Sequence, residues 1–270
     1  MRVADAAPTP SLSDRVAAVD WYHTLTLPGG IVTPGSFDTA DELARIPFPP
    51  SLSGLRCLDV ATADGFWAFE MERRGAAEVL AIDLRHERLD WPADRVAQPG
   101  DGLSRSRSGF ELAREALGSA VAWREQSVYE LDPSELGQFD FVFVGSLLGH
   151  LRDPVAALAA LAGVLRGELL SVDFISAPLT LRHPRAPVAS FEGHEWPLWW
   201  VPNLAAYRSM FGAAGLSVRA AGRPFFVKRG RGYSGAYGLE GERVPVHRRL
   251  RHAATASLGN MHAWVRAAPD

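Results

Sequence analysis

The sequence contains very little cysteine and lysine, and it has no long apolar run. Cys57 is its only cysteine, which rules out an intramolecular disulfide framework, and no group of cysteines and histidines has zinc-site spacing. No apolar stretch approaches the roughly 20 residues that cross a bilayer. The first residues, MRVADAAPTPSLSD, lack the apolar core of a secretory signal peptide. These absences predict a cytoplasmic protein without disulfides, a structural zinc or a membrane partner.

Length and charge suggest how the chain is divided. Its 270 residues, 47% of them hydrophobic, suffice for one or two domains with a sizeable core. We predict an N-terminal arm or lid over 1–50, a core over 51–230 and a basic C-terminal extension over 231–270. The net charge is −3, but residues 219–252 carry nine basic and two acidic side chains. This basic stretch either contacts a phosphate or RNA backbone or forms a solvated surface.

Short apolar runs alternate with helical patterns along the core. Such alternation indicates βαβ units, and therefore a mostly parallel sheet with helices on both faces. The predicted fold class is α/β, doubly wound. Strands are expected at 56–61, 78–83, 121–123, 139–144, 168–175, 216–221 and 224–228, and helices at 65–74, 109–118, 154–166 and 202–214.

The turn after the first core strand favours a cationic ligand. In doubly wound sheets, ligands bind beyond the carboxyl ends of the strands. Here Ala61 and Ala63 stand where a dinucleotide enzyme has glycines, and the acid Asp64 follows them. An acid there would repel a pyrophosphate but suits a sulfonium nucleoside with an ammonium group. Asp83, at the end of the second strand, is the expected acceptor for ribose hydroxyls, the alternative being a surface or helix-capping aspartate.

Two segments carry a family resemblance. LDVATADGFWAFEMERRGAAEVLAIDL and FDFVFVGSLLGHLRDPVAAL resemble class I S-adenosylmethionine-dependent methyltransferases. The chain is similar in particular to the branch around the tRNA wobble-uridine carboxymethyltransferase, including the arm residues Trp21-Tyr22-His23 and the run Trp199-Trp200-Val-Pro202-Asn203. The resemblance covers about residues 20–225. It implies a Rossmann-like fold with a seven-stranded sheet, and S-adenosylmethionine as the cofactor.

The resemblance also implies roles for individual residues. Asp59 and the 61–63 backbone should face the methionine ammonium, Asp83 the ribose, and Leu84 the adenine. Residues after the third strand should meet the adenine edge, and residues after the fourth should lie below the methyl group, although Gly145 has close strand packing as its alternative. The full set expected at the cofactor is Trp21, Asp59, Ala61, Thr62, Ala63, Gly65, Asp83, Leu84, Ser127, Val128, Gly145 and Ser146.

Departures from that branch favour plain methyl transfer. The wobble-uridine enzyme grips a carboxylated cofactor with lysines and a tyrosine, and this sequence has His23 and Glu42 at the lysine positions and Gly149 at the tyrosine position. A glutamate would repel the carboxylate at short range. The long basic N-terminal region associated with tRNA modification is also missing from this sequence.

Methyl transfer needs an aligned nucleophile and, where that nucleophile carries a proton, a base, but no metal. His150 and His23 are the predicted catalytic histidines; each has a structural role as its alternative, and His183 and His194 are further candidates. Asp64 either orients an acceptor hydroxyl or caps the first core helix, and we favour the cap.

An insertion over 177–200 is expected to cover the acceptor. Its run FEGHEWPLWW predicts an acceptor wall of His194, Trp196, Trp199 and Trp200, with a hydrophobic plug as the alternative. The predicted function is methylation of an oxygen or nitrogen of a small molecule, such as a secondary metabolite. The alternatives are RNA base modification, including wobble uridine, and a nucleoside-binding relative without catalysis.

Overall fold

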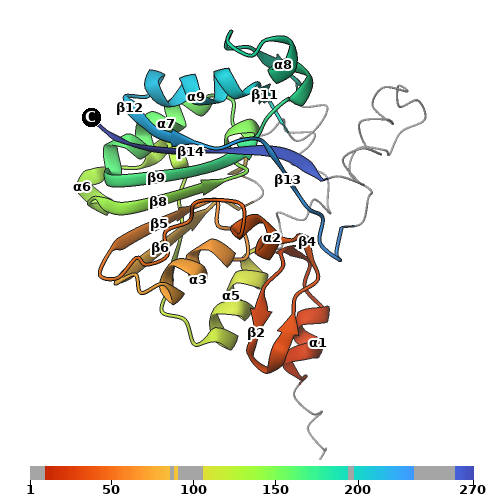
Figure 1. Ribbon diagram of the computed structural model, residues 1–270. Helices are drawn as coiled ribbons and strands as arrows, with labels where there is room; N and C mark the ends of the chain where they lie inside the picture. Colours follow the sequence, from red (N-terminus) through yellow and green to blue (C-terminus); the bar gives the residue numbers. More distant parts are fainter. Residues whose placement is uncertain (1–9, 86–87, 91–105, 194–197, 234–258) are drawn as a thin grey trace, which may run out of the picture.

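One large sheet organises the chain in this computed structural model, which describes residues 10–85, 88–90, 106–193, 198–233 and 259–270 (Figure 1). The strand order is β12-β14-β9-β8-β5-β6-β7, with β13 paired to β14 beside this path. Strands β7, β6, β5, β8 and β9 are mutually parallel, and all three pairings of β14 are antiparallel. The strands are β5 (Arg56–Val60), β6 (Glu78–Asp83), β7 (Ala122–Glu125), β8 (Phe139–Gly145), β9 (Leu165–Phe174), β12 (Leu216–Ala221), β13 (Phe225–Val227) and β14 (Asn260–Pro269). The predicted mostly parallel, Rossmann-like sheet is confirmed, with β13 as an eighth strand.

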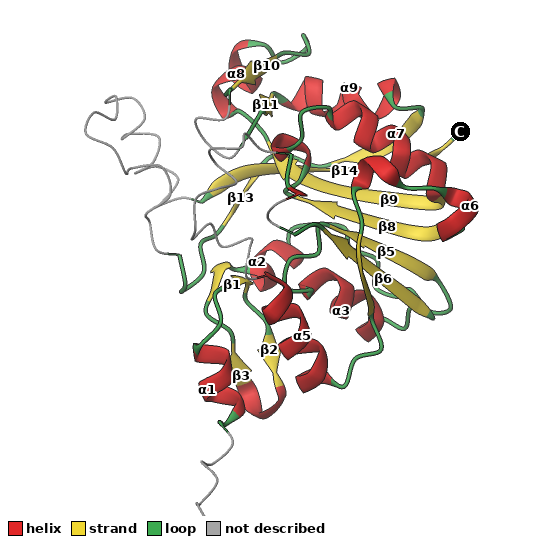
Figure 2. Cartoon of the chain, turned by 180° about the vertical axis from the view of Figure 1, so that it is seen from behind, coloured by secondary structure: helices red, strands yellow, loops and turns green. Residues whose placement is uncertain are grey.

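Helices cover both faces of this sheet, as Figures 1 and 2 show. One face carries α3 (Phe66–Arg73) and α5 (Ser106–Leu117), and the other carries α6 (Pro133–Leu136), α7 (Pro154–Val164) and α9 (Leu204–Ala213). Successive strand residues point to opposite faces, so both faces of a doubly covered strand are apolar. In β8, Val142 and Val144 pack on the α7 face, whereas Phe141 and Phe143 pack on the α3 face.

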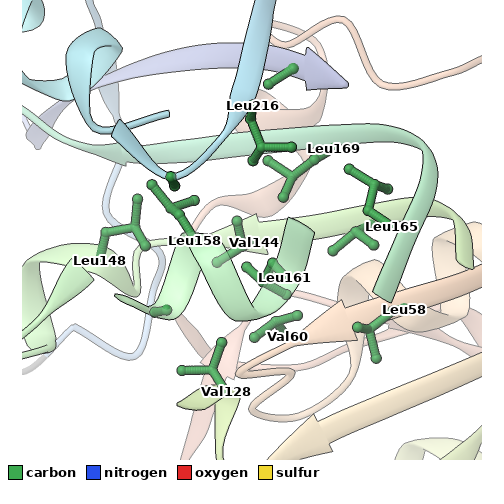
Figure 3. Packing of buried hydrophobic residues seen from close by; sticks show 14 of the residues in the cluster. Leu58, Val60, Val128, Val144, Leu148, Leu158, Leu161, Leu165, Leu169 and Leu216 are labelled. Carbon is green, nitrogen blue, oxygen red and sulfur yellow. The ribbon is translucent and has the colours of Figure 1, made fainter. Parts of the chain in front are cut away.

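Figure 3 shows the hydrophobic core on the α7 face of the sheet, where Leu158 and Leu161 of α7 lie over Val60 and Val144 of the strands. Alanine and leucine make up most of α7, and both have high helix propensity. The helix begins at Pro154, and the Asp153 carboxylate caps it by accepting a hydrogen bond from the Ala156 N–H. No helix within the described ranges is long and apolar enough to cross a membrane.

The N-terminal arm packs on the α5 side of the molecule. It consists of α1 (Leu12–Ala17), β1 (Trp21–His23), β2 (Thr26–Leu27), η1 (Pro28–Gly30), β3 (Ile31–Val32), β4 (Gly35–Phe37) and α2 (Thr39–Leu43). β1 pairs in parallel with β4, and β2 pairs antiparallel with β3. Val16, Trp21 and Leu25 are buried in one cluster with Phe110 of α5. The arm therefore completes the hydrophobic core on the face of the sheet that carries α3 and α5.

Residues 260–269 correct the predicted extent of the core. They form β14, which lies between β9 and β12 in the sheet, so the part of the prediction that ended the core at residue 230 is wrong. Most of the remaining predicted extension, 234–258, lies outside the described residues.

Short elements complete the chain at the edge where the parallel strands end. They are η4 (Val128–Glu130), η5 (Leu148–His150), α8 (Ala177–Arg182), β10 (Ala189–Phe191) and β11 (Trp200–Pro202).

Candidate functional site

The candidate site lies at the carboxyl ends of β5, β6 and β8. The chain runs outward from β5 to β6 and β7 and then returns to β8 on the other side of β5. This reversal of strand order is where doubly wound folds bind their ligands. The candidate site residues therefore come from the turns that follow these strands.

The turn after β5 has an unusual backbone. Ala61 and Ala63 have φ values of 58° and 48°, in the left-handed region that residues with a Cβ rarely occupy. Two backbone bonds fix the turn: the Thr62 N–H donates to the Ile82 carbonyl at 3.1 Å, and the Gly65 N–H donates to the Thr62 carbonyl at 2.8 Å. A strained turn of small residues at a strand end is typical of a ligand site.

Two predicted cofactor acids flank this turn. The Asp59 carboxylate accepts a hydrogen bond from the Thr62 hydroxyl at 2.6 Å, and Asp83 accepts from the Ala63 and Leu84 N–H groups, each at 2.8 Å. Burial raises the pKa of Asp59 to about 7 and that of Asp83 to about 6, against the lowering effect of these bonds. The structure thus brings Asp59, Thr62, Ala63, Asp83 and Leu84 together as predicted, at a place where a cation would stabilise the charged carboxylates.

Asp64 does not cap α3, so the favoured sequence interpretation is wrong. The helix begins after Gly65 without a side-chain cap. The Asp64 carboxylate instead accepts hydrogen bonds from the Tyr22 N–H at 2.7 Å and the His23 N–H at 3.0 Å, and it lies 2.5 Å from His23 Nδ1. Asp64 therefore fastens the arm onto the turn.

His23 is buried beside three acids. Burial lowers its pKa, but the Asp64, Glu42 and Asp59 carboxylates together raise it by more, so the pKa of His23 lies above its ordinary value. Burial raises the pKa of Glu42 to about 7. With only 5% of its surface exposed and Nδ1 bonded to Asp64, His23 joins the arm to the turn, while its predicted catalytic role stays a prediction.

Other predicted cofactor residues have clear packing roles. The Trp21 indole is buried, and its Nε1–H donates to the Val16 carbonyl at 2.9 Å. A Cβ on Gly65 would lie 2.5 Å from the Phe69 ring and 2.6 Å from the Phe110 ring, so close packing explains this glycine. Neither the Trp21 hydrogen bond nor the packing at Gly65 involves the carboxylates of the turn.

The next strand end contributes Ser127 and Val128, which follow β7. The Ser127 hydroxyl accepts a hydrogen bond from the Tyr129 N–H at 3.3 Å, and Val128 is buried in the α7-side core. Both lie where the adenine edge was expected, and their contact with a nucleoside stays a prediction.

The turn after β8 contains a residue pair that the sequence analysis missed. Gly145 and Ser146 end the strand as predicted; a Cβ on Gly145 would lie 2.8 Å from the Phe143 ring, in line with the packing alternative. Ser146 has φ 50°, and its Oγ lies 3.1 Å from His262 Nε2 of β14. The signal for His262 is the apolar run MHAWV around it, which falls in the predicted extension outside the core.

Asp173, at the end of β9, holds the same turn. Its carboxylate accepts hydrogen bonds from the Leu147 and Leu148 N–H groups at 2.9 and 2.7 Å, and burial raises its pKa to about 6. Asp173 therefore positions the segment between Ser146 and His150.

The predicted acceptor side is partly described. His150 ends η5, with its ring 5.9 Å from that of Phe174. The Trp199 N–H donates to the Gly149 carbonyl at 2.7 Å, which joins the 177–200 segment to the His150 turn. Trp200 donates its indole N–H to the Arg152 carbonyl at 3.0 Å. His183 lies at the end of α8, whereas His194 and Trp196 lie outside the described residues.

Comparisons with known proteins agree with this geometry. A family model described as a methyltransferase domain matches residues 58–168, from β5 into β9. Ubiquinone biosynthesis O-methyltransferase from Xanthomonas euvesicatoria pv. vesicatoria is 35% identical over 115 residues, 43% of this chain and 40% of that protein. The enzyme of that name from Marinobacter nauticus is 30% identical over 156 residues, 57% of this chain and 56% of that protein. The chain thus matches about half the length of these relatives.

Solved structures establish the fold. The N-terminal domain of EvdMO1, crystallised in the presence of S-adenosylhomocysteine and D-fucose, matches with a TM-score of 0.54 and 18% identity, over 95% of this chain and 93% of that one. The Bacillus halodurans C-125 protein BH2331 matches with a TM-score of 0.52 and 15% identity, over 86% and 99%. The fold is the Rossmann-like fold of class I methyltransferases.

Proposed function

We propose that this chain binds S-adenosylmethionine at the ends of β5, β6 and β8 and transfers its methyl group to an oxygen or nitrogen of a small molecule. One observation carries the proposal: buried carboxylates surround a strained turn within the segment that matches the methyltransferase family model. A sulfonium nucleoside with an ammonium group supplies positive charge, which the buried Asp59 and the partly buried Asp83 need. The similarity to O-methyltransferases and to a domain crystallised with S-adenosylhomocysteine supports the same reading.

The residues present fit this nucleoside. Asp59 would hold the ammonium group. Each Asp83 oxygen accepts one N–H from the described part of the chain, so its second lone pair would accept a ribose hydroxyl. Leu84 and the residues after β7 would line the adenine, with Gly145 and Ser146 below the reacting end.

When bound, the cofactor supplies a methyl group on a positively charged sulfur. The chain's own task is then to align the acceptor atom with the methyl carbon and to exclude water. The His150 turn, joined to Trp199, would form one wall of that chamber. His23 and Asp64 would hold the arm closed on the opposite side.

Plain methyl transfer fits better than carboxymethyl transfer. Gly149 stands at the position of the wobble-uridine enzyme's tyrosine, and there even a Cβ would lie 3.0 Å from Leu198 Cδ2 and 3.1 Å from the Trp200 carbonyl oxygen. Glu42, at a lysine position, is a buried acid beside His23. A carboxylate placed among these groups would be buried without a cationic partner. Such burial costs roughly several kcal/mol in a protein interior.

A small acceptor fits better than RNA. Three of the five described basic residues in the 219–252 stretch contact other parts of the chain. Lys228 pairs with Asp41 at 2.9 Å, and Arg229 donates to the Asn260 side chain at 2.9 Å. Arg219 donates to the Pro269 carbonyl at 3.2 Å. These contacts support the solvated-surface interpretation of the basic stretch.

The first test is calorimetric titration of S-adenosylmethionine into wild type and Asp83→Ala. Two lost charge-assisted hydrogen bonds should weaken binding by roughly 1.5–3 kcal/mol, about ten- to a hundred-fold. Asp132→Ala, which removes an exposed carboxylate at the start of α6, is the control. Equal affinity in a folded Asp83→Ala protein, or tight binding of NAD by wild type, would contradict the proposal.

The second test separates the acceptor classes. In competition titrations, S-adenosylmethionine should bind at least about tenfold more tightly than its carboxylated analogue, because the analogue's carboxylate finds no cation. The reverse order would restore the wobble-uridine reaction. Bulk tRNA at near-physiological salt should give no gel shift, and a sub-micromolar complex would make RNA the substrate.

A further inference from the structure

Ser146 and His262 form a hydrogen-bonded pair between β8 and β14. Ser146 Oγ lies 3.1 Å from His262 Nε2, and the other ring nitrogen, Nδ1, lies 2.9 Å from the Asn260 carbonyl oxygen. The two residues are 116 positions apart in the sequence and meet only because β14 inserts beside β9.

These contacts fix where the protons are. A carbonyl oxygen can only accept, so His262 Nδ1 carries the hydrogen that it donates to Asn260. Burial, together with the nearby Arg229 charge, lowers the pKa of His262 to about 4, so the imidazole is neutral near pH 7 and its Nε2 has a bare lone pair. Ser146 must therefore donate its hydroxyl hydrogen to His262.

The consequence concerns the other side of the serine oxygen. Once its only hydrogen points to His262, Ser146 Oγ has lone pairs alone to offer any other partner. His262 is fully buried, whereas Ser146 is only partly buried at the end of β8. The pair thus presents a hydrogen-bond acceptor, and no donor, at the carboxyl edge of the sheet.

Aromatic rings lie around His262, the residue that orients the Ser146 hydroxyl. The His262 ring lies 4.4 Å from that of Phe174 and 6.3 Å from that of Phe225, and Phe174 lies 5.9 Å from His150. His150, Phe174 and Phe225 are all partly exposed. A planar aromatic ring would pack well against such side chains.

The backbone supports a role for the hydroxyl. Ser146 has φ 50°, a conformation that glycine adopts at lower energy than any residue with a Cβ. The serine at this position therefore carries backbone strain that a glycine would avoid.

We propose that His262 is a positioning residue that holds the Ser146 hydroxyl as a hydrogen-bond acceptor, and that this oxygen receives the O–H or N–H of an aromatic methyl acceptor. The inference rests on the proposed methyl transfer and adds the chemical class of the acceptor: an aromatic ring bearing a protonated oxygen or nitrogen. Ethers and carboxylates, which lack a donor, would be excluded.

The test measures ligand binding to protein saturated with S-adenosylhomocysteine. Saturation is established first by titration, so failure to bind this nucleoside counts against the proposed function alone. Catechol, 1,2-dimethoxybenzene and benzoate are then titrated; the first has O–H donors and the other two have none. Wild type should bind catechol about tenfold more tightly than either, the worth of one hydrogen bond of about 1.4 kcal/mol.

Ser146→Gly is the decisive variant, because glycine tolerates the φ of this position and the change removes only the hydroxymethyl group. Its preference for catechol should fall to within about threefold of the other two ligands, the ratio expected once that hydrogen bond is gone. His262→Phe should have the same effect by freeing the hydroxyl to rotate. If His262→Phe does not fold, Ser146→Gly still decides.

A spectroscopic measurement tests the positioning role directly. In ¹⁵N-histidine-labelled protein, His262 should show the Nδ1–H tautomer in wild type, with an Nε2 signal that moves in Ser146→Gly. Three results would overturn the proposal: saturated wild type binding no catechol, saturated wild type binding all three ligands equally, or Ser146→Gly keeping the full preference.

Discussion

At the scale of single residues, burial disfavours the charged form of the acids around the first turn. Burial raises the pKa of Asp59 from 3.8 to about 7 and that of Glu42 from 4.5 to about 7. A raised pKa means that the fold disfavours the charged form of the acid relative to the unfolded chain. Such groups contribute stability below pH 4 that is lost as the pH rises toward 7. They are typical of binding sites, where a ligand supplies the missing charge.

Asp59→Asn should therefore be more stable than wild type at neutral pH. The amide keeps an oxygen for the Thr62 hydroxyl but carries no charge. The two proteins should have similar melting temperatures near pH 4, and the variant should melt several degrees higher above pH 7, since about 1 kcal/mol shifts the transition of a chain of this size by about 2–4 °C.

Calorimetric scans from pH 4 to pH 8 measure this difference. The same variant should lose S-adenosylmethionine binding, because the ammonium would meet a neutral amide. An Asp59→Asn protein that is less stable than wild type at pH 8 would show that the carboxylate is stabilised by groups other than a bound cation.

Which site residues were predictable depends on how far away their partners lie in the sequence. Asp59 and Asp83 end apolar runs, and a strand end in a parallel sheet is a ligand position whatever the rest of the chain does. Asp64 was misread because its partners, Tyr22 and His23, precede it by about 40 residues in an irregular arm. His262 was missed for the same reason.

At the scale of elements, one buried carboxylate joins the arm to the turn after β5. Asp64 is fully buried and accepts from two backbone N–H groups of β1 and from the His23 ring. Val16, Trp21 and Leu25 then bury their side chains against the α5 side. Arm and core therefore share a hydrophobic cluster, and opening the arm would expose it.

Asp64→Asn should loosen the arm. The amide nitrogen cannot accept a hydrogen bond, so at least one N–H of β1 or the His23 ring loses its buried partner, and disrupting a buried ion pair costs about 3–5 kcal/mol. We expect a melting temperature lower by at least about 5 °C and faster chymotrypsin cleavage after Trp21, Tyr22 and Phe37. Scanning calorimetry and timed digestion measure both effects.

Arg15→Gln is the matched control, because it removes an exposed ion pair between α1 and Glu115 of α5. It should leave melting and cleavage nearly unchanged, as expected for a surface pair. Unchanged cleavage within residues 21–37 of Asp64→Asn would show that apolar packing alone holds the arm.

The apolar parallel strands were predicted closely, whereas β14 was not assigned to the sheet. The run FDFVFV predicts a strand at 139–144, and β8 spans Phe139–Gly145, because a doubly buried strand must be apolar throughout. The run MHAWVRAA contains fewer β-prone residues, and its place in the sheet depends on β9, about 95 residues earlier. Only the assembled sheet reveals that pairing.

At the scale of the whole molecule, the strand β14 joins β12 and β13 to the parallel part of the sheet. β14 pairs with β9, β12 and β13, and its Ala263, Val265 and Ala267 side chains are fully buried. Without it, β9 would present an unpaired edge beside the candidate site. The same strand carries His262 to Ser146, so fold completion and the inferred acceptor contact depend on one element.

A chain that ends at residue 258 should therefore fail to fold cooperatively. Removing β14 takes away the backbone partners of β9 and β12 and exposes the apolar side chains beneath them. We expect an insoluble product or the loss of a cooperative transition by circular dichroism.

A chain ending at residue 269 lacks only the exposed Asp270 and should melt like wild type. Val265→Asp, which buries a charge in the middle of β14, should reproduce the truncation, whereas Ala268→Asp at a partly exposed position should be tolerated. A soluble 1–258 chain with a wild-type melting curve would show that β14 is added to a sheet already stable without it.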